Sequence, residues 1–408
     1  MSSTLNRHTE AFIYLDKTGE IGTISLAPAS KGSLLLTGNS PSEDSSFTLS
    51  SLDSEQNEKL LAVHHFEPGD EIFFGLSAQA GPCDTLFLAG ALWGDDLYPA
   101  FARLKASGPL DNSFGNAGTK VFRDLASKQE TQTRADAAQV KVMASAAAPS
   151  STTHIALPGG GYLIASAETG YLLRLKDNGE LDTDFGDGGK LKPVPEGAED
   201  FELTNASLRS DKVILVLGDA GLKGILATYD MDGKPIKGFG ETGMVTIEHK
   251  DRVNLLNLSL SPDQNAVNIV GMTRVEGKRR AFLARLNAFD GKVDTGFNNG
   301  LPFYLQLNDH ETSFWQIATR MNQDQEERIY AVGGILDVSN TGYIAAAFDK
   351  HGLVKDEFPT GVAIGKKATL ANSMLVTEAP PRLVVGGGVE MEDSNDFQGF
   401  VALHPLSQ

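Results

Sequence analysis

One short pattern recurs five times along this 408-residue chain and limits what the chain can fold into. Each copy is an apolar strand, a glycine turn, and a phenylalanine about six residues after that glycine. The copies are FARLKASGPLDNSFGNAGTKVF from Phe101, YLLRLKDNGELDTDFGDGGKL from Tyr171, ILATYDMDGKPIKGFGETGMVTI from Ile225, FLARLNAFDGKVDTGFNNGLPF from Phe282 and IAAAFDKHGLVKDEFPTG from Ile344. Recurrence of this kind predicts structural units that bury their faces against each other.

A second element, an apolar run that ends in or near glycine, occurs seven times. The runs are LLLTG (34–38), LFLAG (86–90), YLIAS (162–166), ILVLG (214–218), NIVG (268–271), YAVGG (330–334) and LVVGG (383–387). Each follows an alternating segment: GTISLAP, EIFFGLS, HIALP, FELTNASL, LLNLSLSP, SFWQIAT and SMLVTEA. Alternation with a period of two indicates a β-strand, and the short polar or Gly/Pro links indicate hairpin turns. One unit therefore contains four strands: the alternating segment, the glycine-ended run, the apolar strand that opens the repeat copy and the strand after its Phe-Gly turn.

Seven such units predict an all-β fold, a seven-bladed β-propeller of four-stranded antiparallel blades. The last unit stops at its third strand, GFVALHPLSQ, and the N-terminal segment AFIYL (11–15) has no unit of its own. We expect AFIYL to complete the last blade and close the ring. Residues 1–408 then form a single domain. The segment 127–151 lacks strand periodicity and is expected to be an inserted loop or short helix between blades two and three.

The pattern RLKDNGELDTDFGDGGKL resembles the bacterial delta-60 repeat, whose members carry an Arg-Leu, Gly, Leu-Asp, Phe-Gly pattern in propeller-like arrays. The match is good at 101–121, 171–191 and 282–300, and partial at 225–247 and 344–361. The resemblance implies a bacterial propeller protein and brings no activity with it.

Two positions of the repeat are candidates for a structural role. An arginine and an aspartate occur together in three copies and are both missing from the other two: Arg103 with Asp111, Arg174 with Asp182, Arg285 with Asp294, against Thr228 with Ile236 and Ala347 with Lys355. Residues that come and go as a pair within one blade indicate an ion pair that braces the corner, since either partner half-buried alone is costly. The recurring aromatics are predicted to be core anchors between blades: Phe114, Phe185, Phe239, Phe297 and Phe358.

The acidic glycine loops raise the question of a metal ion. DTDFGDGG (182–189) and DMDG (230–233) are rich in aspartate, but neither completes the ligand spacing of an EF-hand. Asp-Gly pairs are also typical of tight hairpin turns, which is the interpretation we prefer. Asp184 and Asp187 are the two acids that the repeat does not explain, and whether they bind an ion stays open at this stage. We assign no metal ligand.

No catalytic or cofactor-binding residues are assigned either. The glycine clusters PGGGY (158–162) and VVGGGV (384–389) lack the phosphate-loop pattern and a following helix. HExxH, GxSxG and the sialidase S-x-D-x-G-x-T-W box do not occur, and His64 and His65, neighbours on a strand, would point to opposite faces. The loops after the glycine-ended runs carry acids, including Glu168, Asp219 and the EMEDSND segment (390–396), which we take to be solvated surface. ALWGDDLY (91–98) adds a possible exposed aromatic contact through Trp93 and Tyr98.

Composition narrows the class of protein further. A net charge of -18 disfavours a nucleic-acid partner, because binding duplex needs basic surface. There is no run long enough for a membrane span and no signal-peptide pattern, which favours the cytoplasm, with leaderless export as an alternative. A single cysteine, Cys83, excludes an internal disulfide framework.

For function, these observations favour a non-enzymatic binding or interaction scaffold for a protein, peptide or carbohydrate, acting as a monomer without cofactor. Two alternatives remain. One is a propeller hydrolase or lactonase with a metal at the channel mouth, which should show carboxylates, Asn or His converging on one channel end. The other is an exported structural module.

Overall fold

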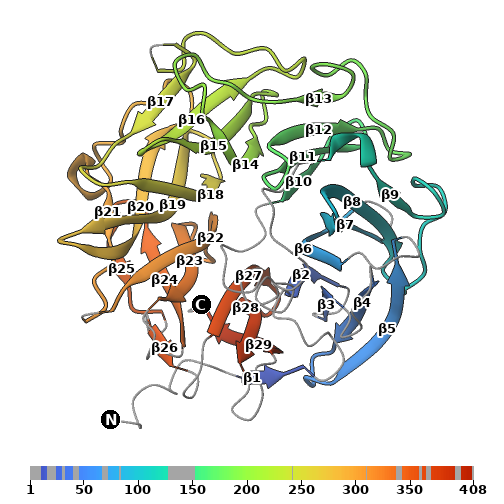
Figure 1. The fold of residues 1–408 in the computed structure, drawn as a ribbon. Coiled ribbons are helices and arrows are strands. Elements are labelled where there is room, and N and C mark those ends of the chain that lie inside the picture. The colour runs from blue at the N-terminus through green and yellow to red at the C-terminus, as the bar shows by residue number, and fades with distance from the viewer. Residues whose placement is uncertain are drawn as a thin grey trace.

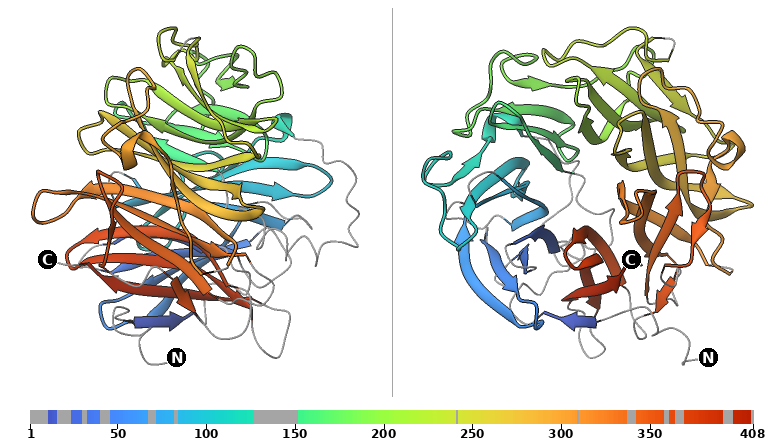
Figure 2. Two further views of the ribbon diagram at one scale, coloured as in Figure 1. Left: turned by 90° about the vertical axis from the view of Figure 1, so that its left-hand side faces the viewer. Right: turned by 180° about the vertical axis from the view of Figure 1, so that it is seen from behind.

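The computed structural model describes residues 11–15, 24–29, 33–39, 46–66, 72–81, 84–126, 152–240, 242–308, 310–336, 342–357, 361–363, 369–390 and 397–406. Seven antiparallel sheets stand around a common centre, and the chain passes once round the ring from blue to red (Figure 1). The view from behind shows the same order (Figure 2). The chain is thus an all-β, seven-bladed propeller, as the repeat predicts. The inserted segment 127–151 lies outside the described residues.

The first three blades contain four strands each, named here from the centre outward. Blade 1 is β2 (Ile24–Pro28), β3 (Leu34–Asn39), β4 (Ser46–Leu52) and β5 (Glu58–His65). Blade 2 is β6 (Ile72–Ala80), β7 (Thr85–Trp93), β8 (Leu97–Lys105) and β9 (Thr119–Val121), followed by the 3-10 turn η2 (Arg123–Leu125). Blade 3 is β10 (Thr153–Ala156), β11 (Tyr162–Ser166), β12 (Tyr171–Leu175) and β13 (Lys190–Leu191).

The next three blades follow the same plan. Blade 4 is β14 (Glu202–Leu208), β15 (Ile214–Ala220), β16 (Lys223–Tyr229) and β17 (Met244–Ile247). Blade 5 is β18 (Val253–Leu260), β19 (Ala266–Val275), β20 (Lys278–Asn287) and β21 (Phe303–Tyr304), with the 3-10 turn η4 (Asn298–Gly300) before β21. Blade 6 is β22 (Thr312–Met321), β23 (Glu327–Ile335), β24 (Gly342–Asp349) and β25 (Val354–Lys355), and β26 (Gly361–Ala363) also pairs with β24.

Blade 7 joins the two ends of the chain. It consists of β27 (Thr369–Glu378), β28 (Pro381–Glu390), β29 (Phe397–Pro405) and, as its outer strand, β1 (Ala11–Tyr14). The antiparallel register places Ala11 opposite Leu403 and Tyr14 opposite Phe400. Figure 1 shows β1 beside β29 at the junction of the first and last blades. The predicted closure by residues 11–15 is confirmed.

The recurring phenylalanines are confirmed as buried anchors between blades. Phe114, Phe185, Phe239 and Phe297 are each at most 2% exposed, while Phe358 lies outside the described residues. Phe114 also explains why the repeat needs its glycine. A Cβ on Gly179 of the next blade would lie 2.8 Å from the Phe114 ring, and Gly179 has a φ of +84°. The glycine therefore serves both the turn and the aromatic anchor of the preceding blade.

A backbone hydrogen bond accompanies each anchor. The N–H of the residue after the repeat phenylalanine donates to the carbonyl just before the repeat glycine of the next blade. These bonds run from Gly115 to Asn178, Gly186 to Asp232, Gly240 to Asp290 and Asn298 to His351, at 2.8–3.0 Å. Because ring and hydrogen bond recur together, the repeat works as a joint between neighbouring blades.

The paired arginines and aspartates form the predicted ion pairs. Arginine Nε lies 2.8 Å from the Asp Oδ2 for Arg103–Asp111 and Arg174–Asp182, and 2.9 Å for Arg285–Asp294. The arginines also reach the following blade, which the sequence did not indicate. Their next-blade acceptors are Asp177 for Arg103, the Met231 carbonyl for Arg174 and Glu327 for Arg285. Each guanidinium therefore braces its own corner and joins it to its neighbour.

Candidate functional site

The inner strands, which surround the centre of the ring, share an irregularity that the alternation pattern hid. Five of them have a β-bulge at the same level, followed by a polar residue. The five polar residues are Ser77, Asn205, Asn257, Gln316 and Ser373. Bulges redirect side chains and often lie next to functional sites. In the sequence, the signal for this feature is a polar residue within each of these five alternating segments.

We call the polar side chains at this level of the inner strands the belt. They bind neighbouring blades to each other. Asn257 Nδ2 donates to Gln316 Oε1 at 2.8 Å, and Gln316 Nε2 donates to the carbonyl of Asn372 at 3.1 Å. On the other side of the ring, Thr153 Oγ1 donates to Asn205 Oδ1 at 3.3 Å. Because these polar groups form hydrogen bonds between blades, the belt stabilises the inner ring.

One pair in the belt has the composition of a nucleophile and a base. Ser77 Oγ lies 3.1 Å from His154 Nδ1. His154 is 7% exposed, its Nε2 has no hydrogen-bond partner among the described residues, and burial lowers the pKa of its imidazole to about 3. A general base works best with a pKa near the operating pH and with a third group that orients it. The pKa of His154 lies far below neutral pH, and no group in the described part of the chain orients its imidazole.

The acids of the loops after the second strands do not form one solvated surface, contrary to the prediction. Asp95 is exposed, but Asp219 is only 5% exposed and accepts bonds from the Leu255 N–H at 2.9 Å and Asn254 Nδ2 at 3.0 Å. Glu168 is partly buried and accepts a hydrogen bond from the Thr152 hydroxyl. Burial raises the pKa of both carboxyls, that of Asp219 to about 6. Glu43, Asp44, Asp337 and residues 391–396 lie outside the described residues.

Asp219 gives a testable dependence of stability on pH. Its pKa is raised by burial from 3.8 to about 6, so the folded protein retains a proton that the unfolded chain releases. The stabilisation is therefore complete below about pH 4 and is lost as the pH rises to about 6, by up to about 3 kcal/mol. Asp219→Asn should remove this slope, as measured by urea unfolding at pH 4 to 8. Asp95→Asn, an exposed matched control, should retain it, and an unchanged slope in Asp219→Asn would contradict the assignment.

The aspartate loops of the repeat act as turns. Asp187 N–H donates to the Lys190 carbonyl at 2.8 Å, and Asp230 Oδ1 accepts from the N–H groups of Asp232 and Lys234 at 2.9 and 2.8 Å. Asp184 N–H points toward Asp182 Oδ1 at 3.4 Å. Across the described part of the chain, no group of three or more His, Cys, Asp and Glu side chains could hold a metal ion.

The predicted exposed aromatic contact in 91–98 is wrong. Trp93 is 8% exposed because it lies at the end of β7 with its side chain in the packed interior. Tyr98 is partly buried, and the Arg123 guanidinium lies 4.8 Å from its ring centre. Neither residue offers an aromatic platform. No helix in the described residues is long and apolar enough to cross a bilayer.

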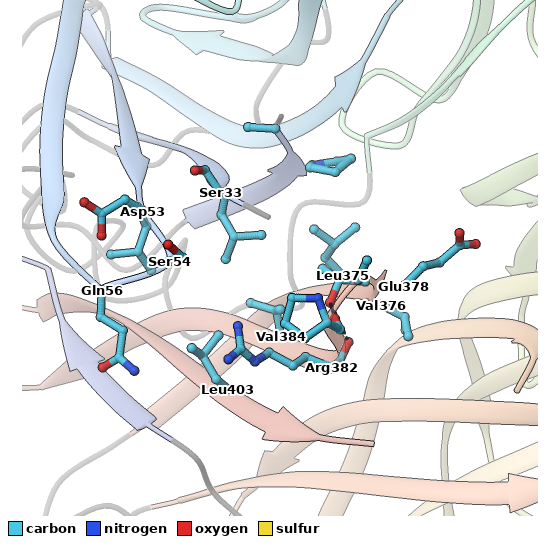
Figure 3. A pocket seen from close by; sticks show the side chains of 17 residues that line it. Ser33, Asp53, Ser54, Gln56, Leu375, Val376, Glu378, Arg382, Val384 and Leu403 are labelled. Atoms are coloured by element: carbon cyan, nitrogen blue, oxygen red, sulfur yellow. Dashed lines mark hydrogen bonds between the residues drawn. The ribbon is translucent and has the colours of Figure 1, made fainter. Parts of the chain in front are cut away.

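A groove at the junction of blades 7 and 1 is a candidate for a binding site. Its volume is about 370 Å³. The apolar part of its lining comes from the facing blades: Pro28, Leu34, Leu52, Leu375, Val376, Val384 and Leu403. Figure 3 shows Leu375, Val384 and Leu403 in the interior, with Ser33, Asp53 and Gln56 on the blade 1 side and Glu378 and Arg382 from blade 7.

The charged side chains that line the groove are Asp53, Glu378 and Arg382. The Asp53 carboxylate accepts from the N–H groups of Glu55 and Asn57 at 2.9 Å and from the Asn57 side chain, so it is held within its own turn. These hydrogen bonds keep its pKa below the ordinary value. The Arg382 side chain extends along the groove toward Leu403 (Figure 3). The groove thus combines an apolar lining with one guanidinium and two carboxylates.

Comparison with known proteins supports the fold. Residues 269–297 match the family described as a domain of unknown function (DUF5122) beta-propeller. This segment is one copy of the repeat and contains Arg285, Asp294 and Phe297. The match supports a propeller family. No curated protein matches the chain.

Several solved structures share the architecture at very low sequence identity. A streptogramin B lyase structure has a TM-score of 0.53 and 8% identity, over 97% of each chain. The extracellular domains 1–2 of Drosophila Semaphorin 1b have a TM-score of 0.48 and 10% identity, over 97% of this chain and 86% of that one. A Trypanosoma rangeli sialidase bound to sialic acid has a TM-score of 0.44 and 10% identity, over 98% of this chain and 57% of that one. At 8% identity, the likeness to the streptogramin B lyase structure shows the fold alone.

Proposed function

We propose that this protein is a non-enzymatic binding scaffold whose ligand site is the groove between blades 7 and 1. The observation that carries the proposal is the mixed lining of this groove, apolar inside with Arg382 extending into it. Ligand sites are typically concave, mostly apolar and supplied with a few polar groups, within volumes of roughly 300–1,000 Å³. The resemblance to the delta-60 repeat concerns the fold and leaves the function open.

The chemistry of the groove favours a peptide segment over a carbohydrate. Its described lining contains leucine, valine, proline and short polar residues but no aromatic side chain on which a sugar ring could stack. Apolar peptide side chains would fit against Leu375 and Val384, and a carboxylate or carbonyl of the peptide would accept hydrogen bonds from Arg382. The ligand is therefore an extended peptide with apolar side chains and an acidic residue or carboxyl end.

A random dodecapeptide display library tests this assignment. We expect selection on the wild-type protein to return peptides with such a motif, and Ser54→Trp, which fills the rim of the groove, to weaken their binding at least tenfold. Ser210→Trp is the matched control, because it changes an exposed turn residue of blade 4 outside the groove. Equal binding to both variants, or failure to select any common motif, would rule out the groove as a peptide site.

A further inference from the structure

The outer strand of blade 1 differs from those of the other blades. β5 contains eight residues, whereas the strands at the outer edge of the other six sheets contain two to four. β5 is the last strand in its sheet, so within the described part of the chain no further strand pairs with its outer side. A long outer strand presents a row of backbone donors and acceptors to another chain.

Two apolar side chains of β5 are exposed on the same side of the blade. Leu60 is 40% exposed and Val63 is 45% exposed. They lie opposite Ser50 and Thr48, which are two residues apart on β4, so both project from one face of the sheet. The extra residue that brings them to one face is Leu61, since the register passes from Leu60 directly to Ala62 at a β-bulge.

The opposite face of β5 is covered by blade 2. Leu61 and Ala62 pack against the core between blades 1 and 2. His64 Nε2 donates to the Gly108 carbonyl of blade 2 at 2.8 Å. These contacts fix the strand in place, so its outer edge and the Leu60–Val63 face are presented as a rigid surface.

We propose that β5 pairs with β5 of a second copy of the chain. The two strands run antiparallel about a two-fold axis between Leu61 and Ala62. Leu60 then lies opposite Val63 of the partner subunit, and Val63 lies opposite the partner's Leu60. In a regular strand these two positions would face opposite sides and could not meet, but the bulge at Leu61 puts them on one side. The surface is therefore complementary to itself, as a symmetric dimer requires.

This pairing joins two four-stranded blades into one continuous sheet. The contact is eight residues long and adds one apolar pair on each side of the axis. It is smaller than a standard interface of roughly 800 Å² per partner, so the dimer is weak and depends on concentration. This proposal replaces the expectation of a monomer, and it does not depend on the groove.

Sedimentation velocity between about 1 and 300 µM tests the association, because a weak dimer has a dissociation constant in the micromolar range. We expect a reversible monomer–dimer equilibrium in the wild type and at least a tenfold rise in the dissociation constant for Leu60→Lys with Val63→Lys. Leu222→Lys is the matched control, since Leu222 is a 63% exposed leucine in a hairpin turn of blade 4. A wild type that stays monomeric throughout, or a dimer that the double lysine variant retains, would overturn the proposal.

Cysteine cross-linking tests the register. In a Cys83→Ser background, an equimolar mixture of the Leu60→Cys and Val63→Cys proteins should form disulfide-linked dimers under mild oxidation. Either protein alone should not, because each cysteine lies away from its own copy across the two-fold axis. Cross-linking of each protein by itself, to the same extent as the mixture, would show a different contact. Equal melting temperatures of all variants confirm that the fold is retained.

Discussion

A variant that lacks residues 1–15 should be much less stable than one that lacks only residues 1–10. The shorter truncation keeps β1, whereas the longer one removes its pairing with β29 and leaves the last blade with three strands. It also removes Leu15, which is 2% exposed, and Phe12, whose ring stacks on Phe400 at 4.9 Å. Each buried large side chain contributes about 1.5–3 kcal/mol, so the loss of these two should be at least about 3 kcal/mol.

Urea unfolding followed by circular dichroism measures this difference, with the shorter truncation as the matched control. The longer truncation should also expose the edge of β29 and increase aggregation. A synthetic peptide of residues 1–15, added in excess, should restore part of the lost stability, since it binds the folded state alone. Equal urea midpoints for the two truncations would contradict closure by β1.

The ring and its closure could be predicted because they rest on local periodicity. Alternating segments, glycine-ended runs and the segment left over at 11–15 are all visible within short windows of sequence. The joint absence of the arginine and the aspartate from two repeat copies also allowed the corner ion pair to be predicted. These features repeat, and repetition lets one copy be checked against another.

Blade 6 shows where this reasoning stops. It has Ala347 at the arginine position, yet its corner still contains a buried ion pair. Arg328, on the neighbouring strand β23, reaches Glu357 at 2.8 Å, and the Tyr330 hydroxyl donates to the same carboxylate at 3.2 Å. The replacement comes from a different strand, so comparing equivalent positions could not reveal it.

The groove escaped prediction for a related reason. Asp53 and Arg382 lie at opposite ends of the sequence, and only closure of the ring brings blades 1 and 7 together. Neither Asp53 nor Arg382 belongs to a recurring motif. A site built where the first and last blades meet has no counterpart in other blades from which it could be recognised.

The joint between blades 5 and 6 should depend strongly on Arg285. Its side chain is 7% exposed and contacts Asp294 at 2.9 Å, Asn268 Oδ1 at 3.0 Å and the carboxylate of Glu327, which is itself 10% exposed. Arg285→Met keeps much of the volume but leaves Glu327 buried without its guanidinium partner. Removing one member of a buried ion pair costs about 3–5 kcal/mol, which is the loss that we expect.

Equilibrium urea unfolding should separate this joint from an ordinary surface pair. Lys292→Met in the same blade breaks an ion pair with Asp290 at 3.0 Å whose lysine is 81% exposed, and it should leave the urea midpoint nearly unchanged. Adding Glu327→Leu to Arg285→Met should recover much of the stability, because the stranded charge is then gone. If Arg285→Met behaved like Lys292→Met, the arginine would contribute no more than a surface charge, and the joint would rest on Phe297 and the backbone bond from Asn298 to His351.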